Sequence, residues 1–461
     1  MSDERPDLVI AGAGGGLVGA LRAAQLGLDV LVVEASQHYR KGNNTSMSTA
    51  MIPGAGSRWQ REAGLEDSPE QFVADVRAKT KGQADERLAL ALGQVSGRLV
   101  EWLADDLGLP LQLVTDFHYP GHSVDRCHTV EGRHGSVLLE HLVRQVRESD
   151  RITMLVPARL VDVELAEGGC TAVIEQPDGT VLRVEAGAVL LATNGYGGDR
   201  ALVQQHLPEI AGAVYHGSEA SRGDALRIGE QLGADAAFLD AYQGHAALAK
   251  RGATLVGWST IMHGGFMVNL SGHRFGNETT GYSEYAAQLA DQEKAEGWLV
   301  FDQRIHDENL VFTDFRQTVE GGALVWADTL RELAEAISVD PEALVQEAQG
   351  LAQVAAGAAE DRFGRASVEA PLRGPYAAVR VVPALFHTQG GLVVDEHARV
   401  LRPDGRPIPG VYASGGAAEG ISGHGAAGYL AGNGLLPALG LAFLAAEHVG
   451  STAHPTETTS S

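Results

Sequence analysis

The stretch VIAGAGGGLVGALRAAQLGLDVLVVEAS, residues 9–36, decides the fold of this chain. A short apolar run that ends at Ile10 predicts a buried strand. Four glycines within five residues follow it: Gly12, Gly14, Gly15 and Gly16. The alanine-rich run after them predicts a helix that ends at Gly27. A second apolar run, VLVVE, predicts another strand, which closes on the acid Glu34.

A strand, a glycine turn, a helix and a strand form a βαβ unit of about 30 residues. Bare glycine backbone lets a pyrophosphate approach, and the helix N-terminus offers free N–H groups and a positive dipole end. An acid about 20 residues further on accepts hydrogen bonds from a ribose, which Glu34 fits. Leu17 stands where the usual third glycine would follow Gly12 and Gly14, whereas a count from Gly14 and Gly16 reaches Gly19. The motif predicts a dinucleotide site without distinguishing NAD from FAD.

Composition sets the limits for the rest of the chain. The 461 residues are 44% hydrophobic and 20% charged, which is typical of a globular protein with two or three domains. A net charge of −24 argues against nucleic acid as a partner. No uninterrupted apolar run is long enough for a membrane span, and the start MSDERPDLVI has no basic region before an apolar stretch, so we expect neither membrane insertion nor a secretory signal.

The cysteines and histidines indicate the cellular compartment and whether to expect a metal site. The two cysteines, Cys127 and Cys170, suit a reducing compartment, so we expect a cytoplasmic protein. Seventeen histidines include no HExxH motif and no tight cluster with metal-ligand spacing, so we expect no metal site.

Two further strand–glycine turns follow the first, near residues 188–198 (AVLLATNGYGG) and 410–420 (GVYASGGAAEG). A large cofactor contacted by both ends of the chain explains all three turns, whereas a nicotinamide domain needs only the first. Between them, helices are expected over 68–108, 328–337 and 340–357, and a hairpin around PDG at 177–179. A closing apolar helix of about 15 residues precedes a polar tail, 451–461, which we expect to be disordered.

Six motifs in order resemble the fumarate reductase and succinate dehydrogenase flavoprotein family. They are GAGGG…VVEAS, GNNTSMSTAMIPGAG, VLLATNGYGGD, SGHRFGNE, FHTQGGLVVDEHARVL and IPGVYASGGAAEG. The departures described below place the chain nearer to the 3-ketosteroid dehydrogenases and tricarballylate dehydrogenase-like proteins of the wider group. The resemblance implies an α/β fold with a Rossmann-like FAD-binding domain built from both chain ends, 1–239 and 366–450. It also implies an inserted α+β capping domain over residues 240–365.

The resemblance implies FAD as the cofactor, held without a covalent bond because no histidine stands in the loop that carries covalent flavin. It assigns cofactor contacts to Gly12, Gly14, Gly15, Gly16, Glu34, Ala35, Asn43, Asn44, Thr45, Ser46, Ser48, Ala158, Ala192, Thr193, Asn194, Gly195, His387, Gly415, Gly416, Asn433 and Leu435. Arg126 and His128 resemble a flavin-side element of the family and are further candidates for a cofactor contact. Gly416 stands where the family usually has a ribitol-binding glutamate, with Glu419 three residues later.

The chain departs from the family where charge is expected. Where fumarate reductases have a proton-donating arginine, this chain has Tyr282, at the same position or one residue from it. The family also has a glutamate and an arginine that form a relay, and the matching segment GWSTI has neither. Tyr429 stands where the family has an arginine that clamps the substrate. These losses predict a substrate with less negative charge than a dicarboxylate, or one held differently. A tyrosine is able to exchange a proton or polarise a carbonyl.

The candidate catalytic residues are therefore Tyr282, His387, His245 and Tyr429. Tyr282 is expected to remove the α proton, and the two histidines to orient and polarise the substrate. Tyr285 lies one helical turn from Tyr282 and competes with it for the same role, and Glu278 is a candidate for fixing the loop.

We expect an FAD-dependent oxidoreductase of CH–CH groups that dehydrogenates a small-molecule substrate α,β to a carbonyl or carboxylate. One alternative is a reductase of an enoate or fumarate-like acid, and another is a flavin-binding subunit without turnover. The electron acceptor is unknown, and a homo-oligomer is possible.

Overall fold

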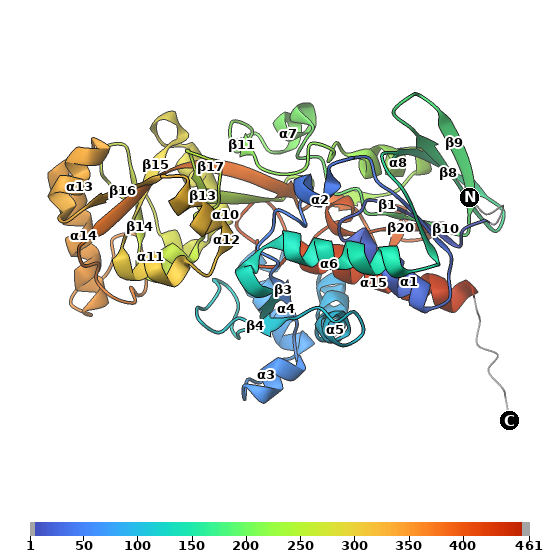
Figure 1. Ribbon diagram of the computed structural model, residues 1–461, viewed down its shortest axis with the longest axis horizontal. Helices are drawn as coiled ribbons and strands as arrows, with labels where there is room; N and C mark the ends of the chain where they lie inside the picture. Colours follow the sequence, from blue (N-terminus) through green and yellow to red (C-terminus); the bar gives the residue numbers. More distant parts are fainter. Residues whose placement is uncertain (1–4, 454–461) are drawn as a thin grey trace.

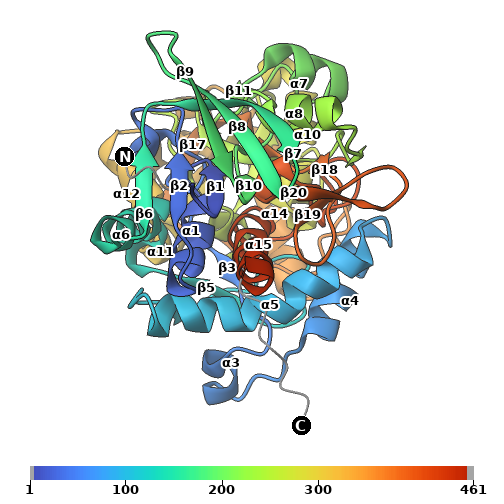
Figure 2. The same ribbon diagram turned by 90° about the vertical axis from the view of Figure 1, so that its right-hand side faces the viewer.

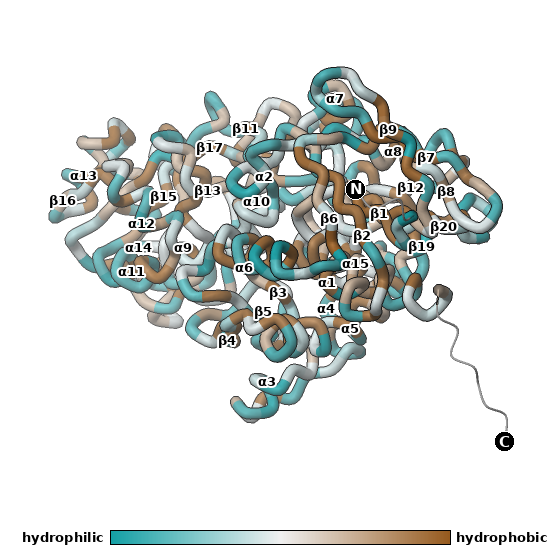
Figure 3. The backbone as a smooth tube through the Cα atoms, turned by 45° about the vertical axis from the view of Figure 1, so that its right-hand side comes forward, coloured by the Kyte–Doolittle hydropathy of each residue, from teal (hydrophilic) through white to brown (hydrophobic). Residues whose placement is uncertain are grey.

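A six-stranded, mostly parallel sheet organises the larger lobe of the protein. The computed structural model describes residues 5–453. The strand order is β19 (Arg399–Leu401), β20 (Pro407–Ala413), β10 (Ala188–Leu191), β1 (Leu8–Ala11), β2 (Val30–Val33) and β6 (Ile152–Leu155), with only β19 antiparallel. All four residues of β1 are buried, as in the continuous apolar strands typical of parallel sheets. These strands form the hydrophobic centre of the tube in Figure 3.

The βαβ unit predicted from residues 9–36 is confirmed. Helix α1 (Gly16–Gln25) connects β1 to β2, and Leu8 pairs in register with Val30. The chain leaves this helix through Gly27, whose φ of +87° is a left-handed conformation that glycine adopts without strain. The prediction succeeds because the glycines of the turn, the helix-forming residues after them and the strand-forming residues on both sides all favour the same βαβ unit.

Helix α15 (Leu435–Ala453) packs side by side with α1 beneath the sheet, and α5 (Glu86–Asp105) lies against α15 (Figure 2). The two long helices approach closely because α1 carries Gly19, where a Cβ would lie 3.0 Å from the carbonyl oxygen of Ala442. A helix from each end of the chain therefore supports the same sheet.

The prediction for the C-terminal segment was partly wrong. The closing helix has 19 residues rather than about 15, so residues 451–453 belong to α15 and not to a tail; residues 454–461 lie outside the described part. By length and composition, α15 is the one helix within residues 5–453 that could cross a membrane, and 67% of its most apolar window is buried inside the protein. Its apolar surface is thus used in the core.

Smaller sheets extend the larger lobe. Strands β7 (Arg159–Ala166), β8 (Gly169–Glu175) and β9 (Val181–Ala186) form an antiparallel sheet, whose β8–β9 turn contains the predicted PDG hairpin. The others combine β3 (Ile52–Pro53), β5 (Cys127–Thr129) and β4 (Gln112–Leu113), and β12 (Ala236–Ala237) with β18 (Gly391–Leu392).

A second six-stranded sheet forms the other lobe, and the long strand β17 (Tyr376–Thr388) connects the two lobes (Figure 1). Its partners are β11 (Val214–Tyr215), β13 (Tyr242–Ala249), β15 (Gly297–Asp302) and β16 (Leu324–Ala327), while β14 (Phe266–Asn269) pairs with β15. Because β17 is central to this sheet, the predicted boundary at 365/366 separates it from its partners. We propose that the capping region extends through β17.

The remaining helices surround these sheets. They are α2 (Tyr39–Gly42), α3 (Arg58–Glu62), α4 (Pro69–Thr80), α6 (Gly135–Glu148), α7 (Arg200–His206), α8 (Asp224–Leu232), α9 (Ser259–Met262), α10 (Tyr282–Ala290), α11 (Gln303–Asn309), α12 (Thr313–Glu320), α13 (Leu330–Ile337) and α14 (Pro341–Ala355), with short 3₁₀ turns η1 (Glu131–Arg133), η2 (Glu278–Thr280), η3 (Glu293–Ala295) and η4 (Gly415–Ala417). The sequence predicted α4, α5, α13 and α14, and Ser68 caps α4 by accepting the N–H of Gln71 at 3.1 Å.

Shortening one buried side chain of α15 tests how strongly the core depends on this helix. Leu439 is fully buried and lies outside the cavity described below. We expect Leu439→Ala to lower the free energy of unfolding by about 2–5 kcal/mol, through lost burial and an unfilled cavity. Val181→Ala, at a position 55% exposed, is the matched control, with an expected change within about 0.5 kcal/mol. Denaturant titration of both variants measures the difference, and equal losses would contradict this account.

Candidate functional site

A single long cavity begins where the parallel strands end and continues to the second sheet. It contains about 1710 Å³ of space, counting the part open to solvent. The segments that follow β1, β2, β10 and β20 all line it, which is the carboxyl edge where α/β sheets bind ligands. The three glycine turns predicted from the sequence therefore converge on one cavity.

The glycine turn after β1 needs bare backbone because its neighbours are very close. Gly12 has a φ of +116°, and a Cβ there would collide with the carbonyl oxygen of Ala192, at the end of β10. A Cβ on Gly15 would lie 2.7 Å from the carbonyl oxygen of Ala438 in α15. The turn is therefore clamped between the neighbouring strand end and the start of the C-terminal helix.

Glu34 lies in the cavity wall at the end of β2, as predicted. Its carboxylate accepts the N–H of Ala13 at 2.8 Å and that of Ser36 at 2.6 Å. Burial raises the pKa of Glu34, while these amide hydrogen bonds act in the opposite direction. The carboxylate fixes the glycine turn and remains on the surface that a ribose would contact.

Two hydroxyl groups in the wall have no hydrogen-bond partner within the described residues. They are Thr193 Oγ1, after β10, and Ser414 Oγ, after β20, and both are buried. Buried polar atoms are almost always satisfied, so these two indicate a polar ligand between them. Together with the glycine amides, the start of α15 and Glu34, they form a donor and acceptor set that fits a dinucleotide.

Most of the residues predicted to bind the cofactor line this cavity. The four that do not are Gly16, Ser46, Gly195 and Asn433. Gly16 begins α1, and Gly195 packs against Thr388. Ser46 donates to the carbonyl oxygen of Asn43 at 2.8 Å, and Asn433 donates to Ser422 at 3.2 Å. These four therefore support the wall from behind.

The far end of the cavity is aromatic. The His245 ring is stacked between Tyr282, at 4.8 Å between centroids, and Phe386, at 5.4 Å. Trp258 stands perpendicular to His245 at 5.8 Å, and Tyr429 meets the edge of Tyr282 at 5.8 Å. These rings come from five separated parts of the chain: β13, the residue before α9, α10, β17 and the segment before α15.

Burial keeps this aromatic end uncharged at neutral pH. It lowers the pKa of His245 to about 3 and that of His387 to about 4, so both imidazoles are neutral. It raises the pKa of Tyr282 and of Tyr429, so both phenols keep their protons. His245 Nδ1 accepts the N–H of Ala247 at 3.0 Å, which places the ring proton on Nε2 and makes that atom a donor.

The charged side chains of the cavity wall all lie near the sheet. They are Glu34, Arg159 and Asp224, and the last two form an ion pair with each other. No arginine, lysine, aspartate or glutamate within the described residues lines the aromatic end. This arrangement agrees with the charge losses noted in the sequence.

Two candidates near Tyr282 have other roles. Tyr285 lies one turn further along α10 but does not line the cavity; its ring stacks on Phe275 at 5.0 Å. Glu278 is fully buried, and its Oε2 forms an ion pair of 2.7 Å with the Arg274 guanidinium. Of the two tyrosines, Tyr282 is therefore the one that lines the cavity, and Glu278 is paired with Arg274 outside it.

The weaker cofactor candidates are also structural. The Arg126 guanidinium is buried between Asp67, at 2.9 Å, and Asp75, at 2.5 Å. His128 shares a hydrogen bond of 2.9 Å with Ser57. Neither residue lines the cavity, and neither does Glu419, whose pKa is raised by burial to about 7.

Sequence reasoning missed several residues of the aromatic end: Tyr119, Trp258, Phe386 and Gln243. Phe386 precedes His387 in the FHTQGG motif and could have been included with it. Tyr119 lies between β4 and β5 and carries no periodic signal. Only the folded chain brings this segment to Tyr282.

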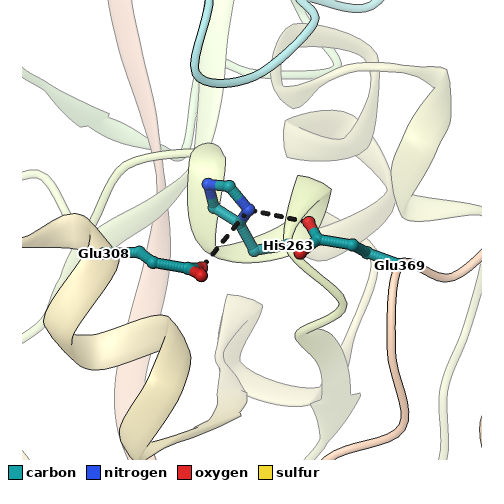
Figure 4. Close-up of side chains that lie close together, drawn as sticks. All are labelled: His263, Glu308 and Glu369. Atoms are coloured by element: carbon teal, nitrogen blue, oxygen red, sulfur yellow. Dashed lines mark hydrogen bonds and ion pairs between the residues drawn. The ribbon is translucent and has the colours of Figure 1, made fainter.

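His263, Glu308 and Glu369 form a compact cluster away from the cavity, and Figure 4 shows both carboxylates turned toward the imidazole. Their candidate ligand atoms lie within 4.8 Å of one another. Arg304 pairs with Glu308 at 3.1 Å and with Glu369 at 3.0 Å, so its positive charge already occupies the carboxylates. We interpret this cluster as a surface ion-pair network.

Comparison with known proteins gives this geometry a context. Residues 7–435 match the family described as FAD binding domain. The NADH:fumarate oxidoreductase of Klebsiella pneumoniae strain 342 is 27% identical over 90% of this chain and 45% of its own length. The 4-oxocyclohexanecarboxylate 2-dehydrogenase of Sinomonas cyclohexanicum is 27% identical over 97% of this chain and 93% of its own.

Among solved structures, the open conformation of a flavocytochrome c3 fumarate reductase superposes with a TM-score of 0.79 at 24% identity, covering 98% of this chain and 79% of that chain. This likeness concerns the fold. Since the chain spans less than half of the Klebsiella relative, that protein has further segments with no counterpart here.

The two unpartnered hydroxyls provide a test of cofactor binding. We expect Thr193→Val and Ser414→Ala each to weaken FAD binding by about tenfold, because each loses one hydrogen bond to the ligand. The melting temperature of the FAD-free protein should stay unchanged, since no bond within the protein is lost. Fluorescence titration with FAD measures the affinity, and unchanged affinity in both variants would remove these hydroxyls from the site.

Proposed function

The chain belongs to the FAD binding domain family, so its dinucleotide is FAD, and we propose that it dehydrogenates a neutral ketone at the carbons α and β to the carbonyl. One observation carries this proposal: the aromatic end contains phenols and neutral imidazoles but no charged side chain. The broader class, an FAD-dependent oxidoreductase of CH–CH groups, matches the relatives described above.

The residues that would hold FAD are Glu34, Thr193, Ser414 and the glycines that line the cavity in the first and third turns, which are Gly12, Gly14, Gly15, Gly415 and Gly416. Bound FAD supplies a hydride acceptor. The rest of the site positions the substrate and handles its proton.

We assign the α proton to Tyr282, because its phenol is the polar group of α10 that lines the aromatic end. The neutral His245 donates from Nε2, and Tyr429 from its hydroxyl, so both are suited to a carbonyl oxygen. Such donors stabilise the negative charge that develops on that oxygen when the α proton leaves. His387 lines the same end and orients the substrate from β17.

A ketone suits this end better than a dicarboxylate. Burying a carboxylate without a cation carries a large desolvation cost, and the wall offers no lysine or arginine there. This argues against reduction of a fumarate-like acid, although a fumarate-reducing enzyme is among the relatives. The name of the relative from Sinomonas denotes a ring ketone that also carries a carboxylate, so it supports the ketone group but not the absence of charge.

Electrons taken from the substrate must pass to an acceptor that is still unidentified. We place this exchange in the cytoplasm, which the two free, buried cysteines Cys127 and Cys170 support. Association of copies of this chain into a homo-oligomer stays a prediction.

The proposed function is tested by anaerobic mixing of the FAD-loaded protein with a panel of saturated compounds. We expect neutral cyclic ketones to bleach the flavin absorbance and succinate to leave it unchanged, because only the former fit an uncharged pocket. Bleaching by succinate alone would contradict the proposal, and bleaching by no compound would leave only the flavin-binding subunit.

The role of Tyr282 is tested against its neighbour. Tyr282→Phe should keep FAD but slow bleaching by at least about tenfold, equivalent to about 1.4 kcal/mol of barrier. Tyr285→Phe is the matched control, because it removes a hydroxyl from the same helix that does not reach the cavity. Stopped-flow absorbance gives both rates, and equal rates would remove Tyr282 from the mechanism.

A further inference from the structure

A second, smaller cavity lies behind the aromatic end. It contains about 260 Å³ of space, counting the part open to solvent, and shares Tyr282, Tyr429 and Ala431 with the large cavity. Its outer wall includes Lys79 and Glu284. It has room for about one water molecule, which would give the two phenols a polar route to Lys79.

The Lys79 side chain is held in the wall of this cavity. It stands near the end of α4, and its Nζ donates to the carbonyl oxygen of Thr280 at 2.7 Å. Glu284 Oε2 lies 3.9 Å from the same nitrogen. The Lys79 side chain is 15% exposed and that of Glu284 is 36% exposed, so the pair spans from the interior to solvent.

The chemistry of Tyr282 requires such a route. Burial raises the pKa of Tyr282, so the phenol is protonated before the substrate binds. To accept a substrate proton, its oxygen must first lose the proton it holds. Neutral imidazoles beside it are poor acceptors, because burial lowers the pKa of His245 to about 3.

We propose that Lys79 is the proton acceptor for Tyr282, acting through water in the smaller cavity. This rests on the proposed function. The phenolic proton passes through water to the neutral Lys79 amine, which becomes an ammonium beside Glu284. The Tyr282 oxygen then takes the α proton as the substrate Cα–H bond breaks. Bound FAD would supply the acceptor for the hydride that leaves Cβ, so that the substrate is oxidised by two electrons. The ammonium finally releases its proton to solvent.

The surroundings of Lys79 suit this exchange. Burial lowers its pKa, so the neutral amine is more accessible than on an exposed lysine; the Glu284 carboxylate opposes this effect and the positive Lys81 adds to it. Tyr282 and Tyr429 are the other titratable groups that line the cavity with it. Because the neutral amine is the acceptor, the rate should rise as pH increases through the lowered pKa of Lys79.

The test compares five forms of the FAD-loaded protein, using a ketone that bleaches the wild type: the wild type itself, Lys79→Met, Lys79→Arg, Lys79→Ala and Lys81→Met. Lys79→Met removes the acceptor, and Lys79→Arg keeps a donor to Thr280 that does not lose its proton. Lys81→Met is the matched control, because it removes an exposed lysine just beyond the same helix. FAD content and the pH dependence of the bleaching rate are measured for each form.

We expect Lys79→Met and Lys79→Arg to slow bleaching by about tenfold or more and to move the rise in rate to higher pH. Lys81→Met should keep the wild-type rate at high pH and move the rise only slightly to higher pH, because it removes the small lowering that Lys81 exerts on the pKa of Lys79. Added methylamine should restore part of the rate of Lys79→Ala. Competitive acetylation of the FAD-free protein should show Lys79 titrating at lower pH than Lys81.

Wild-type rates in Lys79→Arg would reduce Lys79 to a support for Thr280 and overturn the relay while the proposed function stands. Unchanged pH profiles in both Lys79 variants would overturn the relay in the same way. Failure of every ketone to bleach the wild type would overturn the proposed function, and the relay with it.

Discussion

The whole structure depends on one close approach, that of the glycine turn after β1 to the end of β10 and to α15. At Gly12 and Gly15 there is no room for a side chain, because carbonyl oxygens of Ala192 and Ala438 lie against the turn. This contact brings β10 and a helix from the far end of the chain to the edge of the first strand. The backbone amides that would receive a pyrophosphate are presented there as a consequence of packing.

The second sheet contacts the first at the carboxyl end of β10. Strand β17 ends at Thr388, whose side chain packs against Gly195 after β10, so the last residues of β17 lie beside the cofactor cavity. Phe386 and His387 occupy that end of the strand. The strand that is central to the second sheet therefore also contributes residues to the aromatic end of the cavity.

Desolvation decides the chemistry at the aromatic end. The same burial that neutralises His245 and His387 also holds protons on Tyr282 and Tyr429. A site of this kind recognises a neutral, polarisable group and offers hydrogen-bond donors to it, but it needs an outlet for a proton. The smaller cavity at Lys79 is the feature of the described chain that answers that need.

The sequence predicted the parts that local rules determine. The βαβ unit, the capped helix α4 and the three glycine turns follow from propensity, spacing and backbone freedom, and the structure confirms them. The pairing of β17 with β11, in which Val214 lies opposite Ala384, joins residues 170 positions apart, and no local pattern in the sequence predicts it. Tyr119 was missed for the same reason, whereas Tyr285 was a rival to Tyr282 only because helical spacing does not say which face meets a cavity.

The most direct test of the central claim is a crystal structure of the protein with FAD and an α,β-unsaturated cyclic ketone. We predict that the flavin ring lies between the three glycine turns and the aromatic end, with the ketone against it and its carbonyl oxygen within hydrogen-bond distance of His245 or Tyr429. A flavin ring placed outside this cavity, or a ketone bound away from Tyr282, would contradict the account.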